Sequence, residues 1–360
     1  MKSYNHLWEK YISDENIKLA INNASLGKRD RNDVKDIFEN PEKYISEIRE
    51  YATHFYNKRH KPKTINDGIT QKKRTIIVPS FMEQIVHHMI VNVMLPMFNK
   101  GMYEHSYASI PGRGSHKGMK RIKKWIAKDP KNVKFCFKMD IRKFFDSIPH
   151  DKLKAKLEKT IHDKRFLEVL FTLIDVTDVG LPLGFYTSQW LANWYLQGLD
   201  HHIKEDLGAI YYIRYMDDIV VFGSNKRKLH RIHKGIECYL SEELGLSIKN
   251  NWQVYRFDYI RGGKHFGRCL DFMGFKFYRD RVTLRRNIML KATRKAKRLS
   301  HKEKPSIYDI RQMLSYIGWI DHTNTYGMYQ QRIKPYVDIG KLKKRISSYD
   351  RKQNQLKGVA

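Results

Sequence analysis

The spacing of apolar residues alternates between a helical period and short strand-like runs. Residues 1–60 are polar with apolar positions three and four apart, which predicts several helices. Apolar or amphipathic stretches predict further helices over residues 83–98, 187–203, 226–244 and 306–319. Runs rich in β-branched and aromatic residues predict strands over residues 74–79, 135–139, 210–214, 219–222 and 248–257, and a hairpin over 272–284. Because strands and helices alternate irregularly, we expect an α+β fold with a mostly antiparallel sheet.

The net charge of the chain indicates what kind of partner it binds. Of 360 residues, 69 are Lys or Arg and 38 are Asp or Glu, which gives a formal net charge of +31. A charge this large indicates a polyanion such as nucleic acid. Residues 113–143 and 279–304 are especially basic. An apolar content of 41% allows a substantial core, and no repeat or linker-like segment divides the chain.

The sequence shows none of the usual signals for secretion, membrane insertion or disulfide bonding. The chain begins without the apolar segment of a signal peptide, and no apolar run is long enough to span a bilayer. The cysteines Cys136, Cys238 and Cys269 are too scattered for a metal quartet or a disulfide framework. We therefore expect a cytoplasmic protein with no membrane partner.

Two acidic positions follow predicted strands. Asp140 ends the strand over residues 135–139, and Asp217 and Asp218 lie at the tip of the hairpin that joins strands 210–214 and 219–222. Ionised carboxylates in apolar surroundings need a cation, and hard oxygen ligands select Mg²⁺, with Mn²⁺ as an alternative. Three such carboxylates on neighbouring strands would make a two-ion site. Taken singly, the Asp pair also fits a plain turn, and Asp140 fits a strand-end cap or a surface ion pair.

Six motifs then follow in order. Residues 215–218, Tyr-Met-Asp-Asp, resemble motif C of reverse transcriptases, residues 140–148 resemble motif A, and residues 180–189 resemble motif B. Residues 73–79 are similar to the fingers motif, residues 106–114 to the block after it, and residues 270–275 to the primer grip. The resemblance runs from about residue 70 to 285 and covers most of the chain.

The resemblance implies a right-hand polymerase with an antiparallel-sheet palm. It divides the chain into an N-terminal helical extension (1–60), fingers (61–133, with part of 150–180), a palm (134–285), and a helical thumb with a basic C-terminal tail (286–360). It implies Mg²⁺ as two ions, with Asp140, Asp217 and Asp218 catalytic and the Ile141 carbonyl as a further ligand. The residues it implies for dNTP binding are Lys72, Lys73, Arg74, Phe144, Phe145, Leu183, Gly184 and Gln189.

The same resemblance places primer contacts at Tyr215, Met216, Met273 and Gly274. Charge extends the expected primer and template contacts to the basic residues that follow, which are Arg285, Arg286, Lys291, Arg294, Lys295 and Arg298. The positions 291, 294, 295 and 298 recur at helical spacing, so we expect one basic helix face that tracks phosphates; a merely solvated face is the alternative. Phe145 matches the steric gate that excludes a 2′-hydroxyl, although ordinary core packing is also open for it.

Motif B departs from the commonest reverse-transcriptase pattern. Leu183 stands where many members have Gln, and Gln189 follows Ser188 where many have Pro. This version resembles the enzymes of diversity-generating retroelements, which copy RNA with errors at adenine, and also some defence-associated bacterial enzymes. A neutral packing variant at Leu183 is the alternative.

We therefore expect an RNA-directed DNA polymerase that copies a dedicated structured RNA into cDNA from dNTPs. The first expected role is mutagenic copying in a diversity-generating retroelement, with a small accessory protein. The alternative is antiphage defence through cDNA made from a noncoding RNA. A non-catalytic, maturase-like RNA-binding protein is a second alternative, and a DNA-templated repair polymerase is a weaker one.

Overall fold

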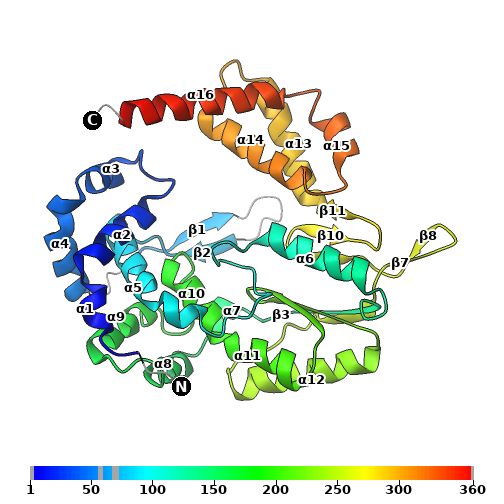
Figure 1. Cartoon of the computed structure of the whole chain (residues 1–360), viewed down its shortest axis with the longest axis horizontal. Coiled ribbons are helices and arrows are strands. Elements are labelled where there is room, and N and C mark those ends of the chain that lie inside the picture. Colours follow the sequence, from blue (N-terminus) through cyan, green and yellow to red (C-terminus); the bar gives the residue numbers. More distant parts are fainter. Residues whose placement is uncertain (1–3, 56–59, 67–72, 358–360) are drawn as a thin grey trace. The chain divides into compact units, whose positions relative to one another are not determined.

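The computed structural model describes residues 4–55, 60–66 and 73–357, with side chains described up to residue 352. Its contacts divide the chain into two compact units (Figure 1). The first combines Met1–Arg113 with Phe137–Val254, and the second combines Gly114–Cys136 with Tyr255–Ala360. The division into fingers, palm and thumb stays a prediction.

The N-terminal part is helical, as the spacing predicts. Its helices are α1 (Leu7–Tyr11), α2 (Asp14–Ser25), α3 (Asn32–Glu39), α4 (Pro41–Thr53) and α5 (Phe81–Asn99). Ser80 caps α5 in a capping box with Glu83, which satisfies two backbone donors at the helix start. Helix α2 packs on α5 through its apolar stripe, with Ile17 and Ala20 fully buried. This packing makes α5 a buried support for the elements that follow.

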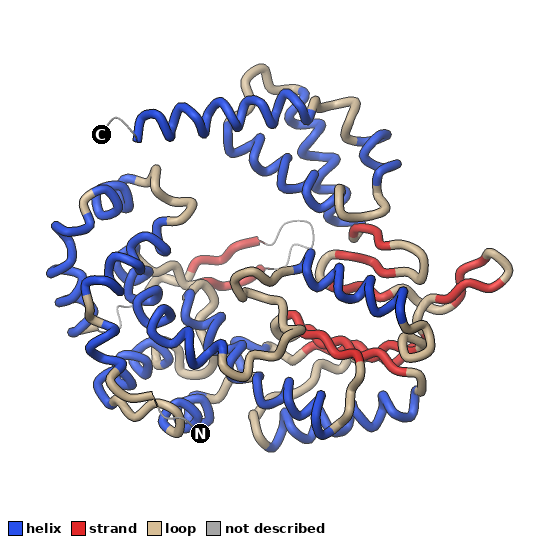
Figure 2. Tube along the Cα trace, viewed as in Figure 1, coloured by secondary structure: helices blue, strands red, loops and turns tan. Residues whose placement is uncertain are grey.

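A four-stranded sheet forms the centre of the first unit. Its order is β4 (Tyr211–Tyr215), β5 (Asp218–Gly223), β3 (Phe135–Asp140) and β6 (Gln253–Arg256). Strands β4 and β5 form the predicted hairpin, in which Tyr215 pairs with Asp218. Helix α12 (Lys226–Glu242) runs along one face of the sheet and contacts β5 (Figure 2). The sequence predicts these strands correctly, but β6 is shorter than the predicted range 248–257.

The helix predicted over residues 187–203 is interrupted. It consists of α10 (Tyr186–Tyr195), α11 (Gln197–His201) and a π-helical turn, His202–Asp206. Lys156 donates through Nζ to the carbonyl oxygens of Trp194 and Tyr195, at 3.0 and 3.1 Å. A side chain that takes carbonyls from the helical ladder breaks its regularity. Because Lys156 is remote in sequence, local spacing could not predict the break.

Shorter elements complete the first unit. They are β1 (Lys63–Asn66), β2 (Lys73–Ile76), α7 (Phe144–Ser147), α8 (His150–Glu158) and α9 (Lys164–Ile174). Strands β1 and β2 pair as an antiparallel hairpin, and β2 ends before the predicted limit at residue 79.

The second unit holds a small sheet and most of the basic helices. Strands β9 (Leu270–Phe272), β10 (Phe275–Phe277) and β11 (Val282–Leu284) form an antiparallel sheet. A separate two-stranded ribbon, β7 (Tyr259–Arg261) and β8 (Lys264–Phe266), is absent from the sequence expectation. The helices are α6 (Ser115–Lys128), α13 (Arg286–Ser300), α14 (Ile307–Ile320), α15 (Tyr326–Arg332) and α16 (Ile339–Lys357). Among the described residues, no helix combines the length and apolar character that crossing a membrane requires.

Candidate active site

The end of β3 meets the turn between β4 and β5. Asp140 is the last residue of β3, and Asp217 lies in the two-residue turn that Tyr215 and Asp218 close. The backbone amide of Ile141 donates to the carbonyl of Asp217 at 3.2 Å. This bond fixes the two segments side by side, so the fold brings Asp140 and Asp217 together as the sequence predicts.

The two carboxyl groups interact directly. Burial, followed by the hydrogen bond and the negative charge of Asp140, raises the pKa of Asp217 to about 7. When two carboxyl groups share one partly dehydrated site, ionising both costs considerable free energy. A divalent cation would relieve this repulsion, so the oxygen-only donor set of the two aspartates fits a hard metal ion.

Two lysines already supply positive charge to this cluster. Lys249 Nζ lies 2.8 Å from Asp140 Oδ2, and its backbone amide donates to the Asp140 carbonyl at 2.9 Å. Lys138 Nζ lies 3.6 Å from Asp218 Oδ1. The hydrogen bond to Asp140 raises the pKa of Lys249. The third carboxylate, Asp218, therefore has a lysine neighbour, while the direct carboxyl–carboxyl contact joins Asp140 and Asp217.

The turn between β4 and β5 has a strained backbone. Met216 has a φ of +57°, a left-handed conformation that non-glycine residues rarely adopt. Of the five described non-glycine residues with positive φ, four lie in segments that the sequence singles out: Ser109, Lys143, Met216 and Met273. Backbone strain of this kind persists where the surrounding structure enforces it, and it concentrates at functional sites.

A buried ion pair supports this turn. The Arg214 guanidinium donates to the Asp200 carboxylate through Nε at 2.7 Å and Nη2 at 2.6 Å, and both side chains are fully buried. Nη1 of Arg214 also donates to the Met216 carbonyl at 3.1 Å. Tyr212 donates to the same Asp200 carboxylate at 2.5 Å. A buried, hydrogen-bonded polar network thus stabilises the left-handed turn.

Sequence reasoning missed Lys249, Lys138, Arg214 and Asp200. Arg214 stands immediately before the Tyr-Met-Asp-Asp segment, so a cation inside an apolar strand was a readable signal. Asp200 and Lys249 gave none, because each meets its partner only through the packing of different elements.

The motif B loop packs against the end of β2. The Ile77 amide donates to the Leu183 carbonyl at 2.8 Å. Gly184 has a φ of +110°, and a Cβ there would lie 2.0 Å from the Ile77 carbonyl oxygen. Only glycine fits, and the backbone that it lets approach is that of Ile77, whereas the sequence expectation assigned this space to a nucleotide.

The remaining residues expected to bind dNTPs differ in accessibility. Lys73 and Arg74 are exposed on β2, Gln189 is exposed on α10, and Lys72 lies outside the described residues. Phe144 is 2% exposed, so the expectation that it contacts a nucleotide is corrected: it packs in the core beside Phe145. Phe145 itself is only half-buried and stays accessible.

The expected primer and template residues of the second unit begin at a tight turn. Met273 and Gly274 join β9 to β10 with φ values of +53° and +89°, as in a type I′ hairpin. A Cβ on Gly274 would lie 2.8 Å from the Trp319 ring. Arg285 forms an ion pair with Asp271.

The basic face predicted on α13 is not continuous. Arg286, Arg294 and Arg298 are exposed and Lys291 is half-buried, but Lys295 is only 6% exposed. Lys295 Nζ lies 2.6 Å from Asp309 Oδ1 on α14. Lys295 is therefore corrected from a phosphate contact to a packing ion pair, because α14 covers that side of the helix.

Comparison with known families decides the classification. Residues 59–255 match the family model described as reverse transcriptase (RNA-dependent DNA polymerase). The chain belongs to the reverse transcriptase family. This span includes the end of β3, the motif B loop and the β4–β5 turn. Membership of the reverse transcriptases implies dependence on a divalent metal ion.

Curated relatives include a retron reverse transcriptase and a protein in the cob intron of a yeast. The retron Ec73 reverse transcriptase of Escherichia coli is 28% identical over 216 residues, which cover 54% of this chain and 64% of that protein. An uncharacterized 91 kDa protein in the cob intron of Schizosaccharomyces pombe is 30% identical over 148 residues, covering 38% of this chain and 18% of that protein. The chain thus spans less than two thirds of the length of these relatives.

A solved structure supports the fold. The apo telomerase of Candida tropicalis aligns with a TM-score of 0.50 at 13% identity, covering 79% of this chain and 59% of that one. Together with the mixed helices and antiparallel sheets, this likeness shows the right-hand polymerase fold of reverse transcriptases.

Proposed function

We propose that the chain is an RNA-directed DNA polymerase that copies a dedicated structured RNA into cDNA. The observation that carries this proposal is the direct contact of the Asp140 and Asp217 carboxyls beside Asp218, on the strand end and turn that the family model covers. A merely structural pair would be costly, because burial opposes the ionisation of Asp217.

Asp140, Asp217 and Asp218, with the Ile141 carbonyl, would hold two Mg²⁺ ions, and Mn²⁺ suits the same oxygen ligands. Such ions lower the pKa of an attacking hydroxyl and neutralise charge on the phosphoryl oxygens. Lys249 and Lys138 keep the metal-free carboxylates partly neutralised. Because both lysines remain partly exposed, they can move aside when divalent ions bind.

Nucleotide selection would fall to the expected residues that the structure leaves accessible. Lys73 and Arg74 on β2 are exposed cations suited to a triphosphate. Phe145 would exclude a 2′-hydroxyl, which makes the product DNA, and Gly184 keeps the motif B loop seated on the end of β2. Leu183 and Gln189 would then contact the base pair being formed.

The nature of the template is proposed from charge and from the retron relative. Tyr215 and Met216 would lie at the primer end, and the Met273–Gly274 turn with Arg285, Arg286, Lys291, Arg294 and Arg298 would contact the primer and template backbone. Because one relative is named a retron reverse transcriptase, we favour for this chain the defence role set out in the sequence analysis, in which cDNA is made from a noncoding RNA.

The first prediction tests the metal site. Replacing Asp217 and Asp218 together by asparagine should lower dNTP incorporation on a primed RNA template by at least about a hundredfold, since the metals supply several kcal/mol of transition-state stabilisation. Binding of the same RNA should stay within about twofold, because both changes remove negative charge. Synthesis that survives in the double variant would refute the assignment.

A second candidate role is mutagenic copying in a diversity-generating retroelement. The observation that favours it is Leu183, an apolar side chain on the half-exposed motif B loop where a glutamine amide could bond to template or nucleotide.

The second prediction separates these roles. Leu183→Gln should lower misincorporation opposite template adenine by roughly 10- to 100-fold, because one changed side chain beside a pocket alters discrimination by about 1–3 kcal/mol. Sequencing of cDNA made by both proteins on one template measures this. Leu183→Met is the matched apolar control. Identical error spectra in all three proteins would contradict the mutagenic role and leave only the defence-type role.

A further inference from the structure

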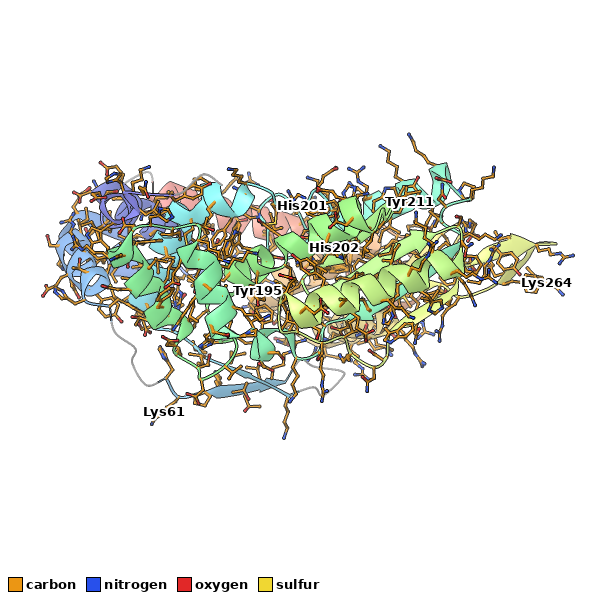
Figure 3. All side chains as sticks on the ribbon, turned by 90° about the horizontal axis from the view of Figure 1, so that it is seen from below. Lys61, Tyr195, His201, His202, Tyr211 and Lys264 are labelled. Atoms are coloured by element: carbon orange, nitrogen blue, oxygen red, sulfur yellow. The ribbon has the colours of Figure 1, made fainter. Side chains whose placement is uncertain are left out.

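The β7–β8 ribbon of the second unit forms a sheet of its own. Its two strands pair only with each other among the described strands, through Tyr259–Phe266, Ile260–His265 and Arg261–Lys264. Gly262 and Gly263 close the turn with φ values of +55° and +71°. The ribbon extends away from the rest of its unit, with Lys264 at the outer end (Figures 1 and 3). Since an isolated hairpin is marginally stable in water, something must hold this one in place.

Pairing register divides the ribbon into two faces. Residues that pair directly in antiparallel strands point to the same side, and neighbours along a strand point to opposite sides. One face therefore carries Tyr259, Phe266, Arg261 and Lys264, and the other carries Ile260 and His265.

The His265 face anchors the ribbon. His265 Nδ1 lies 3.0 Å from Asp258 Oδ2, and Arg281 Nη1 lies 2.7 Å from His265 Nε2. Asp258 is 3% exposed and also accepts the Arg279 amide at 2.7 Å. Asp280 lies 3.6 Å from His265 Nε2. Both ring nitrogens of His265 are thus engaged, so this cluster fixes the ribbon on its unit.

The opposite face presents aromatic rings beside cations. The Tyr259 and Phe266 rings lie 5.7 Å apart with planes 27° from parallel, and the Arg256 guanidinium lies 4.8 Å from the centre of the Tyr259 ring. Phe266 nevertheless stays 44% exposed, and Arg261 and Lys264 form no ion pair with any residue that the structure describes. No acidic residue occurs from Tyr259 to Leu270.

We propose that this face is a docking platform for unpaired RNA, with a base stacked on Phe266 and phosphates bound by Arg261 and Lys264. The proposal rests on the proposed function only for the source of the strand, the single-stranded part of the template RNA. The Tyr259 ring packs beside the Phe266 ring, and the Arg256 guanidinium packs on the Tyr259 ring. The His265 cluster fixes the ribbon from the opposite face.

The chemistry of the face favours a single strand over other occupants. A free base offers a π-face that an exposed ring can stack on, whereas the bases of a duplex are already stacked. An acidic protein would satisfy the two cations but gives no reason for an exposed phenylalanine on the same face. An apolar protein partner gives no reason for a face without acids.

The test compares variants of one ring. Phe266→Leu keeps the apolar bulk and removes the π-face, and Phe266→Trp keeps the π-face. The probe is a fluorescein-labelled, unstructured RNA oligonucleotide, titrated without dNTPs. Phe266→Leu should weaken binding by about 5- to 150-fold, the range for removal of one base–aromatic stack, and Phe266→Trp should bind as tightly as the wild type.

Ile260→Ala is the matched control, because Ile260 is also 44% exposed but lies on the opposite face of the same ribbon. Its affinity for the RNA should stay within about twofold. Equal losses in Ile260→Ala and Phe266→Leu would mean that only the stability of the ribbon matters, and would overturn the proposal.

The cations have their own comparison. Arg261→Gln with Lys264→Gln should reduce the salt dependence of binding by about 0.7 in log–log slope for each RNA phosphate that the protein no longer neutralises. Arg231→Gln with Lys234→Gln removes two exposed cations at the same spacing on α12 and should leave the slope unchanged.

Binding of other nucleic acids tests whether the platform is specific for unpaired RNA. An RNA duplex should show no difference between wild type and Phe266→Leu. A Phe266 effect confined to single-stranded DNA, an equal effect with the duplex, or no effect on RNA would each overturn the proposal; the last would point to a protein occupant. RNA binding of this kind in a chain that incorporates no dNTP would refute the proposed function and leave the platform standing.

Discussion

At the scale of single residues, Asp217 shows how burial and a neighbouring acid act together. Its carboxyl is raised to a pKa of about 7 from an ordinary value of 3.8, first by burial and then by Asp140. Raising a carboxyl pKa favours the protonated form in the folded chain. The stability contributed by this group is therefore fully present below its ordinary pKa and is lost as the pH rises through about 7.

The third prediction follows from that sign. In EDTA, the free energy of unfolding of the wild type should fall relative to Asp217→Asn by about 2–4 kcal/mol between pH 4 and pH 8, since asparagine cannot ionise. Thermal melts of both proteins across this range measure the difference. Mg²⁺ at pH 8 should raise the melting temperature of the wild type more than that of the variant. Parallel pH profiles in EDTA would contradict the coupling.

At the scale of elements, the β4–β5 hairpin depends on a helix break elsewhere in the first unit. Asp200 on α11 binds Arg214 of β4, and Arg214 holds the Met216 carbonyl in the left-handed turn. Helix α11 starts anew at Gln197, next to the carbonyls that Lys156 takes from α10. The interrupted helix and the strained turn are thus connected through one buried ion pair.

The fourth prediction separates stability from positioning. Asp200→Asn alone should destabilise the fold by about 3–5 kcal/mol, because it leaves the Arg214 charge buried without a counter-charge. The triple variant Asp200→Leu, Tyr212→Phe, Arg214→Met replaces the network by apolar groups and should recover most of that loss.

Nevertheless, kcat for dNTP incorporation in the triple variant should stay at least about tenfold below the wild-type value, and KM for the dNTP should change little. The physical reason is that the Met216 carbonyl has lost its donor, worth about 1–3 kcal/mol when buried. Full kcat in a stable triple variant would show that the network serves only the fold.

At the scale of the whole molecule, charge dominates. An excess of Lys and Arg that amounts to +31 is spread over both units, and basic residues are dense in α6 and α13. Some of this charge is internally paired, as in Lys295 with Asp309, and does not reach solvent. Exposed cations such as Arg286, Arg294 and Arg298 remain available to phosphates.

The fifth prediction concerns salt. The affinity of the wild type for a structured RNA should fall with a log–log slope of several units as KCl rises, because each phosphate contact releases condensed counterions. Lys295→Met should leave this slope unchanged, since Lys295 is buried, whereas Arg294→Gln on the exposed side of α13 should reduce it. A flat response of the wild type would argue against phosphate binding.

Several features were readable from local sequence. The Tyr-Met-Asp-Asp hairpin, the strand that ends at Asp140, and α5, α12 and α14 follow from periodicity and turn chemistry, which act over a few neighbouring residues. The family was readable for the same reason, because its motifs are short and ordered.

Tertiary structure decided which side chains meet. Lys249 reaches Asp140, Asp200 reaches Arg214, Lys295 turns to Asp309, and Gly184 admits Ile77. Each of these contacts joins residues from different elements, so its existence depends on packing and burial that no local pattern encodes. The sequence thus determined the elements and the chemistry they carry, and only the fold determined which charges are neutralised and which stay free to bind.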